Sequence, residues 1–170
     1  MLLFIDRMIR AAKLDVNLYE EVEADASLTG QAMGVVILSS IAAGIGAMSK
    51  GGLAGIIWGT VFALAGWYVW AYLTYLIGTK LLPEPQTSSN TAELLRTTGF
   101  SSSPGFIRIL GIIPGVTGFV YLASLLWMLV AMVIAVRQAL DYTSTLRAIG
   151  VCLIGWIVQA VLIGLLYWLS

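Results

Sequence analysis

Long apolar runs alternate with short polar segments along this chain. No charged residue lies between Lys50 and Lys80, and residues 151–170 contain none at all. A helix needs roughly 20 apolar residues to cross the hydrocarbon core of a bilayer. The pattern therefore predicts an all-α integral membrane protein, for which the lipid bilayer is the principal partner.

Four of these runs predict membrane-spanning helices, at residues 28–48, 53–81, 116–136 and 146–168. Residues 50–52 predict a tight turn between the first two helices, and Pro83 ends the second. Helix N-caps are expected before the first and the last of the four, from Ser27 or Thr29 and from Thr143 or Ser144.

The N-terminal segment, residues 2–14, has an amphipathic pattern in which Leu2, Ile5 and Ile9 recur at helical spacing. Such a helix suits the membrane interface, and packing on the protein's own cytosolic face is the equal alternative. Its apolar stretch is too short for a signal peptide, so the first span is expected to act as the insertion signal. Asp15 is expected to cap a second short helix, residues 16–24.

Residues 91–113 decide the number of spans. This segment contains Arg96, Arg108 and Pro104, and hydropathy alone reads it as a loop. If it crosses the membrane, most basic residues outside it share one side, opposite Lys50: Arg7, Arg10, Lys13, Lys80, Arg137 and Arg147. The positive-inside rule therefore favours five spans.

The expected architecture is accordingly a five-helix transmembrane bundle with an amphipathic N-terminal interfacial helix. Residues 1–26 form the cytoplasmic or interfacial part, and residues 27–170 the transmembrane domain. The protein is expected in the cell (inner or plasma) membrane, with a cytoplasmic N-terminus and the C-terminus outside.

Composition narrows the chemistry. Of 170 residues, 59% are hydrophobic and 11% charged, and nine basic residues balance nine acidic ones, which argues against a nucleic-acid partner. The absence of histidine removes the usual general base and the commonest metal ligand. The single cysteine, Cys152, excludes an internal disulfide. We expect no catalytic, cofactor or metal site, and hence no enzyme.

The second apolar run carries small residues every fourth position: Gly51, Gly55, Gly59 and Ala63. Small residues at this spacing let two helix backbones approach closely. We expect the ladder to pack within the bundle, with self-association as the alternative.

Polar residues at membrane depth are functional candidates because hydrocarbon offers them no partner. The candidates are Ser101, Ser102, Ser103, Pro104, Arg108 and Gln159. One hypothesis is a small polar cavity lined by one of the serines and reached by Arg108 or Gln159. The alternative is a simple kink at Pro104, with Arg96 and Arg108 extending to opposite membrane surfaces.

The strongest charge cluster contains Glu20, Glu21, Glu23 and Asp25. A solvated helix face is its ordinary interpretation, and a docking surface for a partner is the alternative.

Several ordered features resemble the prokaryotic branch of the Yip1 family. Residues 14–27 precede the first span, and the polar residues 91–104 resemble the family's third helix. Residues 112–115, Ile-Ile-Pro-Gly, lead into the fourth span and residues 142–148 into the fifth. The resemblance implies a five-helix bundle with a cytoplasmic N-terminus. Eukaryotic members bind prenylated Rab GTPases, but their Asp-Leu-Tyr-Gly-Pro signature is missing here, so Rab binding is not carried over.

The function expected from these features is that of a non-enzymatic Yip1-type membrane interaction or organising factor. Such a factor would bind membrane-protein partners or associate with itself. A small transporter or lipid-handling protein that uses the broken third helix is one alternative. An accessory structural subunit of a larger respiratory or photosynthetic complex is another. Co-purification from native membrane separates these classes.

Overall fold

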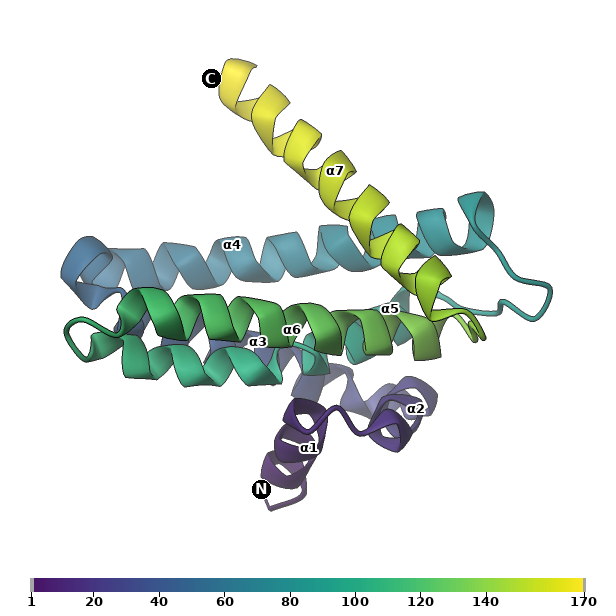
Figure 1. The fold of residues 1–170 in the computed structure, drawn as a ribbon, viewed down its shortest axis with the longest axis horizontal. Helices are drawn as coiled ribbons and strands as arrows, with labels where there is room; N and C mark the ends of the chain where they lie inside the picture. Colours follow the sequence, from purple (N-terminus) through teal and green to yellow (C-terminus); the bar gives the residue numbers. More distant parts are fainter. Residues whose placement is uncertain (1, 170) are drawn as a thin grey trace.

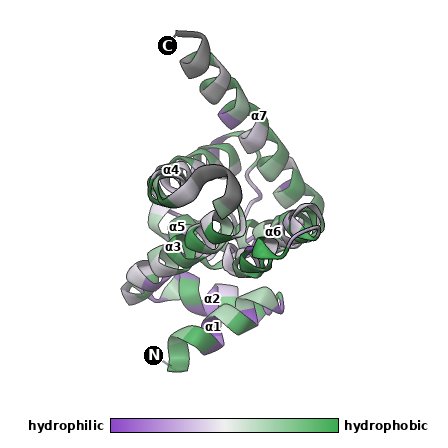
Figure 2. Cartoon of the chain, turned by 90° about the vertical axis from the view of Figure 1, so that its left-hand side faces the viewer, coloured by the Kyte–Doolittle hydropathy of each residue, from purple (hydrophilic) through white to green (hydrophobic). Residues whose placement is uncertain are grey.

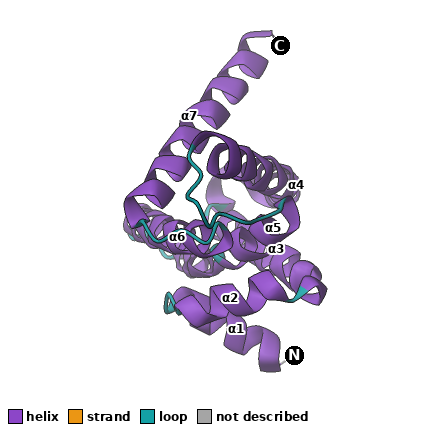
Figure 3. Cartoon of the chain, turned by 90° about the vertical axis from the view of Figure 1, so that its right-hand side faces the viewer, coloured by secondary structure: helices purple, strands orange, loops and turns teal. Residues whose placement is uncertain are grey.

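The chain is all-helical over the part described by the computed structural model, which covers the backbone of residues 2–169 and the side chains of residues 2–48, 52–162, 164 and 165 (Figure 3). Its α-helices are α1 (Leu2–Ala12), α2 (Val16–Ala24), α3 (Thr29–Gly46), α4 (Met48–Leu76), α5 (Thr91–Phe100), α6 (Thr117–Ala139) and α7 (Thr145–Leu169). Short helical segments of other types are η1 (Ala26–Leu28), η2 (Ile77–Leu81) and η3 (Ser103–Ile112).

Four helical stretches are long and apolar enough to cross a membrane: Ala26–Gly46, Gly52–Leu81, Thr117–Ala139 and Thr145–Leu162. They coincide with the four apolar runs of the sequence, whose prediction is confirmed. Helices α3, α4 and α6 lie along the long axis of the molecule, whereas α7 leaves it at an angle (Figure 1). These helices indicate a membrane protein.

The expected fifth long helix is absent from the described residues. Instead, α5 stops at Phe100 and the chain continues as the 3₁₀ helix η3. Asn90 and Glu93 start α5 with a reciprocal capping box. Pro104 lies at the beginning of η3 and cannot donate a backbone hydrogen bond, which explains why α5 does not continue.

The segment formed by α5 and η3 nevertheless follows α3 along its length, in parallel. Gly99 lies on Ala32, Gly105 on Ser39 and Gly111 on Gly46. A Cβ atom added to Gly99 would lie 2.8 Å from the Ala32 Cβ, and one added to Gly111 would lie 3.2 Å from the Gly46 carbonyl oxygen. A side chain would thus overlap α3 at Gly99 and Gly105, and would be tightly packed at Gly111.

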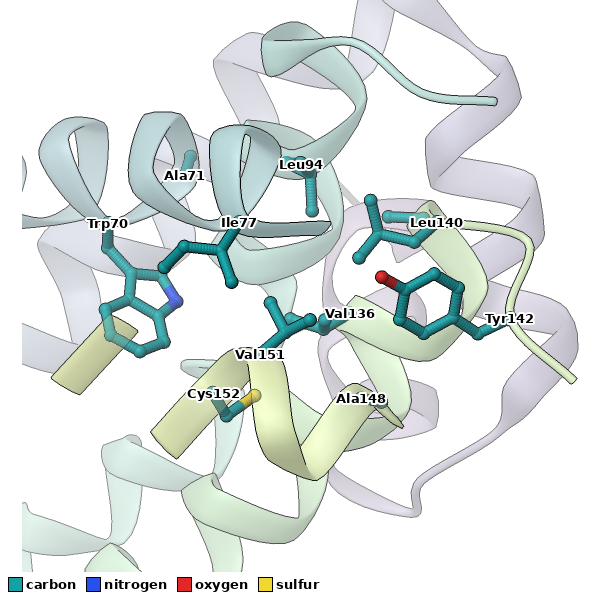
Figure 4. Packing of buried hydrophobic residues seen from close by; sticks show 11 residues of the cluster. Trp70, Ala71, Ile77, Leu94, Val136, Leu140, Tyr142, Ala148, Val151 and Cys152 are labelled. Carbon is teal, nitrogen blue, oxygen red and sulfur yellow. The ribbon is translucent and has the colours of Figure 1, made fainter. Parts of the chain in front are cut away.

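A hydrophobic cluster joins α4, α6 and α7 at the end of the bundle where the polar loops lie. Trp70, Ile77 and Val136 belong to it, together with Val151 (Figure 4). The buried Tyr142 hydroxyl lies 2.7 Å from the Leu82 carbonyl oxygen and anchors the loop after α6 to the end of η2.

Helices α1 and α2 pack on the side of this bundle. Asp15 caps α2 as predicted, accepting a hydrogen bond from the Asn17 amide. Ala11, Leu18, Tyr19 and Val22 are buried together with Phe100 of α5. The expected amphipathic character of α1 is visible in Figure 2.

Two expected N-caps have different outcomes. Neither Ser27 nor Thr29 caps the first span, because the side chain of Asp25 accepts the Ser27 amide and starts η1 instead. Ser144 does accept from the Arg147 amide at the start of α7, at 3.4 Å. The turn expected at residues 50–52 is centred on Gly52, whose φ of 56° breaks the helix.

The predicted packing of the α4 ladder within the bundle is wrong for Gly55 and Gly59. Gly55 and Gly59 are exposed, and a Cβ atom at either would meet nothing within 4 Å. Ala63 alone turns inward, whereas Gly51 lies outside the described side chains. Both faces of a helix in lipid are apolar, so spacing alone did not reveal which face meets a neighbour.

Candidate functional site: a polar cavity among the membrane helices

A cavity of about 260 Å³ lies between α3, α4, α6 and α7. The α5–η3 segment forms a further wall of this cavity. Its polar lining comes from four different elements and from the α5–η3 junction. These polar residues are Ser39, Ser40, Thr98, Ser102, Arg108 and Gln159. The remaining walls are apolar or aromatic and include Trp67, Trp70, Met128, Met132 and Trp156.

Arg108 supplies the positive charge of this cavity. Its Nε donates a hydrogen bond to the Ser124 hydroxyl at 2.9 Å, and its Nη2 lies 3.0 Å from the Met128 sulfur. The guanidinium carbon lies 5.8 Å from the centre of the Tyr121 ring. Among the described residues, no carboxylate lies within ion-pair distance of Arg108. This half-buried cation therefore has no counter-charge among the described residues.

Several cavity side chains also have unused hydrogen-bonding capacity. Within the described part of the chain, the side chains of Ser39, Ser102 and Gln159 form no hydrogen bond. Ser40 is different, because its hydroxyl contacts the Ile37 carbonyl and the Thr60 hydroxyl, at 2.9 and 3.1 Å. Polar groups surrounded by hydrocarbon are costly without partners. The cavity thus suits water or a polar ligand group.

The 3₁₀ geometry explains why Ser102 and Arg108 share one face. A 3₁₀ helix has three residues per turn, so residues 102, 105 and 108 lie above one another. Gly105, between them, lets Ser39 of α3 approach, and a methyl group at this position would overlap the Ser39 hydroxyl. The same segment thereby directs two polar side chains into the cavity and makes room for a third.

The other three residues of the predicted polar site point elsewhere. The Ser101 hydroxyl donates to the Thr98 carbonyl at 2.7 Å, within its own helix. Ser103 and Pro104 line a separate apolar groove beneath α1, of about 460 Å³. The Ser103 hydroxyl is buried and has no hydrogen-bond partner in the described structure. The structure thus brings together Ser102, Arg108 and Gln159 and separates them from Ser101, Ser103 and Pro104.

The two arginines of the third segment have different partners within the chain. Arg96 is buried, and its Nε donates to the Val22 carbonyl at 2.8 Å while its Nη2 contacts the Glu23 carbonyl. It thus caps the C-terminus of α2, where unpaired carbonyls and the helix dipole favour a cation. Arg108 instead faces the cavity.

Sequence reasoning missed the aromatic walls of the cavity. Trp67 and Trp70 belong to the second apolar run, and both line the cavity. The indole N–H of Trp67 donates to the Leu95 carbonyl at 3.1 Å, and that of Trp70 to the Met132 sulfur at 3.2 Å. Their donors are already used, so these rings serve as apolar walls.

A second hollow, about 460 Å³, lies between α6 and α7. Leu125, Leu129 and Ala160 line it, and it shares Trp156 and Gln159 with the polar cavity. Here α7 diverges from the rest of the bundle (Figure 1). The polar cavity is therefore adjacent to an apolar hollow on the lateral, lipid-facing side of the molecule.

The acidic cluster near the N-terminus is largely engaged within the chain. Glu21 forms ion pairs with Arg7 and Arg10, at 2.8 and 2.7 Å. Glu20 accepts from the Gln138 amide. Burial, and then the nearby Asp141 carboxylate, raises the pKa of Glu23 to about 7. Asp25 caps η1. Glu20, Glu21 and Asp25 thus have partners within the chain, and among the described contacts only Glu20 reaches a helix of the bundle, at Gln138 of α6.

Comparison with protein-family models, with curated proteins and with solved structures finds no match for this chain. Within the described residues, no group of three or more acidic or cysteine side chains is arranged to hold a metal ion. The candidate site therefore rests on its own geometry.

Proposed function

We propose that the chain is a non-enzymatic, five-span membrane protein of Yip1 type that binds an amphiphilic molecule of the bilayer in its polar cavity. The observation that carries this proposal is the convergence of Arg108, Ser102 and Gln159, all with unused hydrogen-bonding capacity, on one cavity. Uncompensated polar groups at membrane depth are conspicuous because they are costly. A lipid headgroup in the cavity could form hydrogen bonds with all three of these side chains.

The parallel course of α3 and the α5–η3 segment supports the fifth span. If α3 crosses the bilayer, the segment matched to it at Gly99, Gly105 and Gly111 crosses with it. Its irregular backbone is tolerable at this depth because protein surrounds it.

The two polar loops support the same topology. The Thr143 amide donates to the Glu84 carboxylate at 2.9 Å, so the loop after η2 and the loop after α6 lie at one end of the bundle. Glu20 of α2 contacts Gln138 at this end as well. Arg137, Arg147 and the N-terminal helices then lie on the same side, which the positive-inside rule assigns to the cytoplasm of the cell membrane.

Native mass spectrometry of the detergent-purified protein tests the proposed activity. The wild type is expected to retain one tightly bound amphiphile. Gly66→Phe should abolish its retention, because a side chain at Gly66 points toward the Gln159 amide, 3.8 Å from the added Cβ. Gly59→Phe is the matched control on the outer face of α4 and should leave binding intact. A wild-type protein that retains no bound molecule would refute the proposal.

An organising factor, or an accessory subunit of a larger complex, is the second candidate. It is favoured by the apolar side chains that α7 leaves exposed, among them Leu153, Ile157 and Val161. Gly55 and Gly59 add an exposed small-residue face on α4. Co-purification of a stoichiometric protein partner from native membrane, or a dimer of this chain, would support this candidate.

A further inference from the structure

We infer that the bound amphiphile has an acidic headgroup, a phosphate or a carboxylate, which Arg108 binds, and that its apolar chain leaves the cavity between α6 and α7. This inference rests on the proposed function and specifies its ligand.

The charge of the cavity argues for an anion. Arg108 is the one charged residue among the described residues that line it. Its Nε and Nη2 face Ser124 and Met128, and its Nη1 donates no hydrogen bond within the described chain. A neutral hydroxyl and a thioether do not neutralise a guanidinium, whereas a phosphate or carboxylate does so with short, charge-assisted hydrogen bonds.

The neutral polar residues of the cavity fit the same ligand. The hydroxyl of Ser102 and the amide of Gln159 can both donate to anionic oxygens. They come from the segment preceding η3 and from α7, on different sides of the cavity. An anionic headgroup that contacts Arg108 could also accept hydrogen bonds from Ser102 and Gln159.

The hollow between α6 and α7 provides a path for the apolar part. Leu125, Leu129 and Ala160 line it, and Trp156 and Gln159 border both this hollow and the polar cavity. A molecule with its headgroup at Arg108 would therefore have its chain among apolar side chains that face the bilayer. This arrangement distinguishes a lipid from a free anion, which would leave the apolar hollow unused.

The experiment is reconstitution in nanodiscs containing equal parts of phosphatidylcholine and phosphatidylglycerol, followed by native mass spectrometry of the lipid retained on extraction. The wild type is expected to retain phosphatidylglycerol preferentially. Arg108→Gln should reduce this preference by about tenfold, whereas Arg108→Lys should keep most of it. Lys80→Gln, which removes an exposed charge outside the cavity, should leave the preference unchanged.

The outcomes separate the two proposals. If the wild type retains no lipid at all, the proposed function fails. If lipid is retained and lost in Gly66→Phe, but Arg108→Gln and Arg108→Lys both keep the wild-type preference, the acidic headgroup is refuted while the proposed function stands. A third arm adds millimolar inorganic phosphate. If phosphate alone displaces the lipid, the site binds a soluble anion, and the inference that its ligand is a lipid is refuted.

Discussion

The backbone of Gly46 in α3 lies so close to the main-chain carbonyl of Arg108 in η3 that a methyl group on Gly46 would overlap the carbonyl oxygen. This contact fixes the level at which η3 passes α3. It also fixes the part of η3 from which the Arg108 side chain reaches the cavity, since the Arg108 carbonyl has no room to move toward α3.

Gly46→Ala is therefore expected to destabilise the folded protein by about 1–3 kcal/mol through overpacking. Gly59→Ala, at an exposed position of α4, should be neutral or stabilise by up to about 1 kcal/mol through helix propensity. Denaturant titration in a mild detergent measures both. Equal stabilities of the two variants would mean that α3 and η3 do not make this contact.

Cysteine accessibility tests the topology. In a Cys152→Ala background, cysteines replacing Lys80 and Thr145 should react with an impermeant reagent from the same side of the membrane. A cysteine replacing Ile113, exposed at the far end of η3, should react from the opposite side. If positions 80 and 145 react from opposite sides, residues 91–113 do not cross the membrane and the five-span topology is refuted.

Glu84 should make stability dependent on acidic pH. The Thr143 backbone amide, and then its hydroxyl, hold the pKa of this carboxyl at about 2, below its ordinary value of 4.5. The folded state thus favours the ionised form, and the stabilisation is complete above about pH 4.5 and lost as the pH falls toward 2. The melting temperature should drop over this window in the wild type and less in Glu84→Gln. Parallel curves for the two proteins would contradict this role.

Glu23 should make the stability of the folded protein depend on pH in the opposite direction. Its pKa of about 7 arises chiefly from burial, with a further contribution from Asp141. The folded state favours the protonated form, so stability should decline as the pH rises from about 4.5 to about 7. Glu23→Gln should be more stable than the wild type at pH 8, by about 1 kcal/mol after allowing for partial solvent exposure, and equal to it at pH 4. Glu20→Gln is the control, and a uniform gain at every pH would refute the assignment.

The sequence predicted the elements that hydrophobic length and capping determine. The four apolar runs became α3, α4, α6 and α7, and Asp15 caps α2. It did not predict the change from α-helix to 3₁₀ helix after Phe100, because a polar segment shielded by other helices has no distinctive hydropathy. The three-residue spacing of Ser102, Gly105 and Arg108 was readable, but only once the 3₁₀ geometry was known.

Tertiary contacts explain the remaining differences. The carbonyls at the end of α2 give Arg96 a partner 74 residues away in the sequence, which the sequence pattern did not predict. Likewise, the glycines that permit close packing are not those at regular spacing in α4. Several of them lie where α3 meets the α5–η3 segment, and others lie where α3 meets α4 and where η2 meets Leu140, which no single-helix pattern could indicate.

Photolabelling measures directly where on the protein the lipid binds. A phosphatidylglycerol analogue with a diazirine beside its headgroup is bound to the protein in nanodiscs, activated by light, and its attachment sites are mapped by peptide sequencing. We predict attachment concentrated at the cavity, on residues 102–108 and around Gln159, and loss of this attachment in Gly66→Phe. Attachment spread over the outer face of α4 around Gly55 and Gly59, with none at the cavity and no effect of Gly66→Phe, would contradict this prediction.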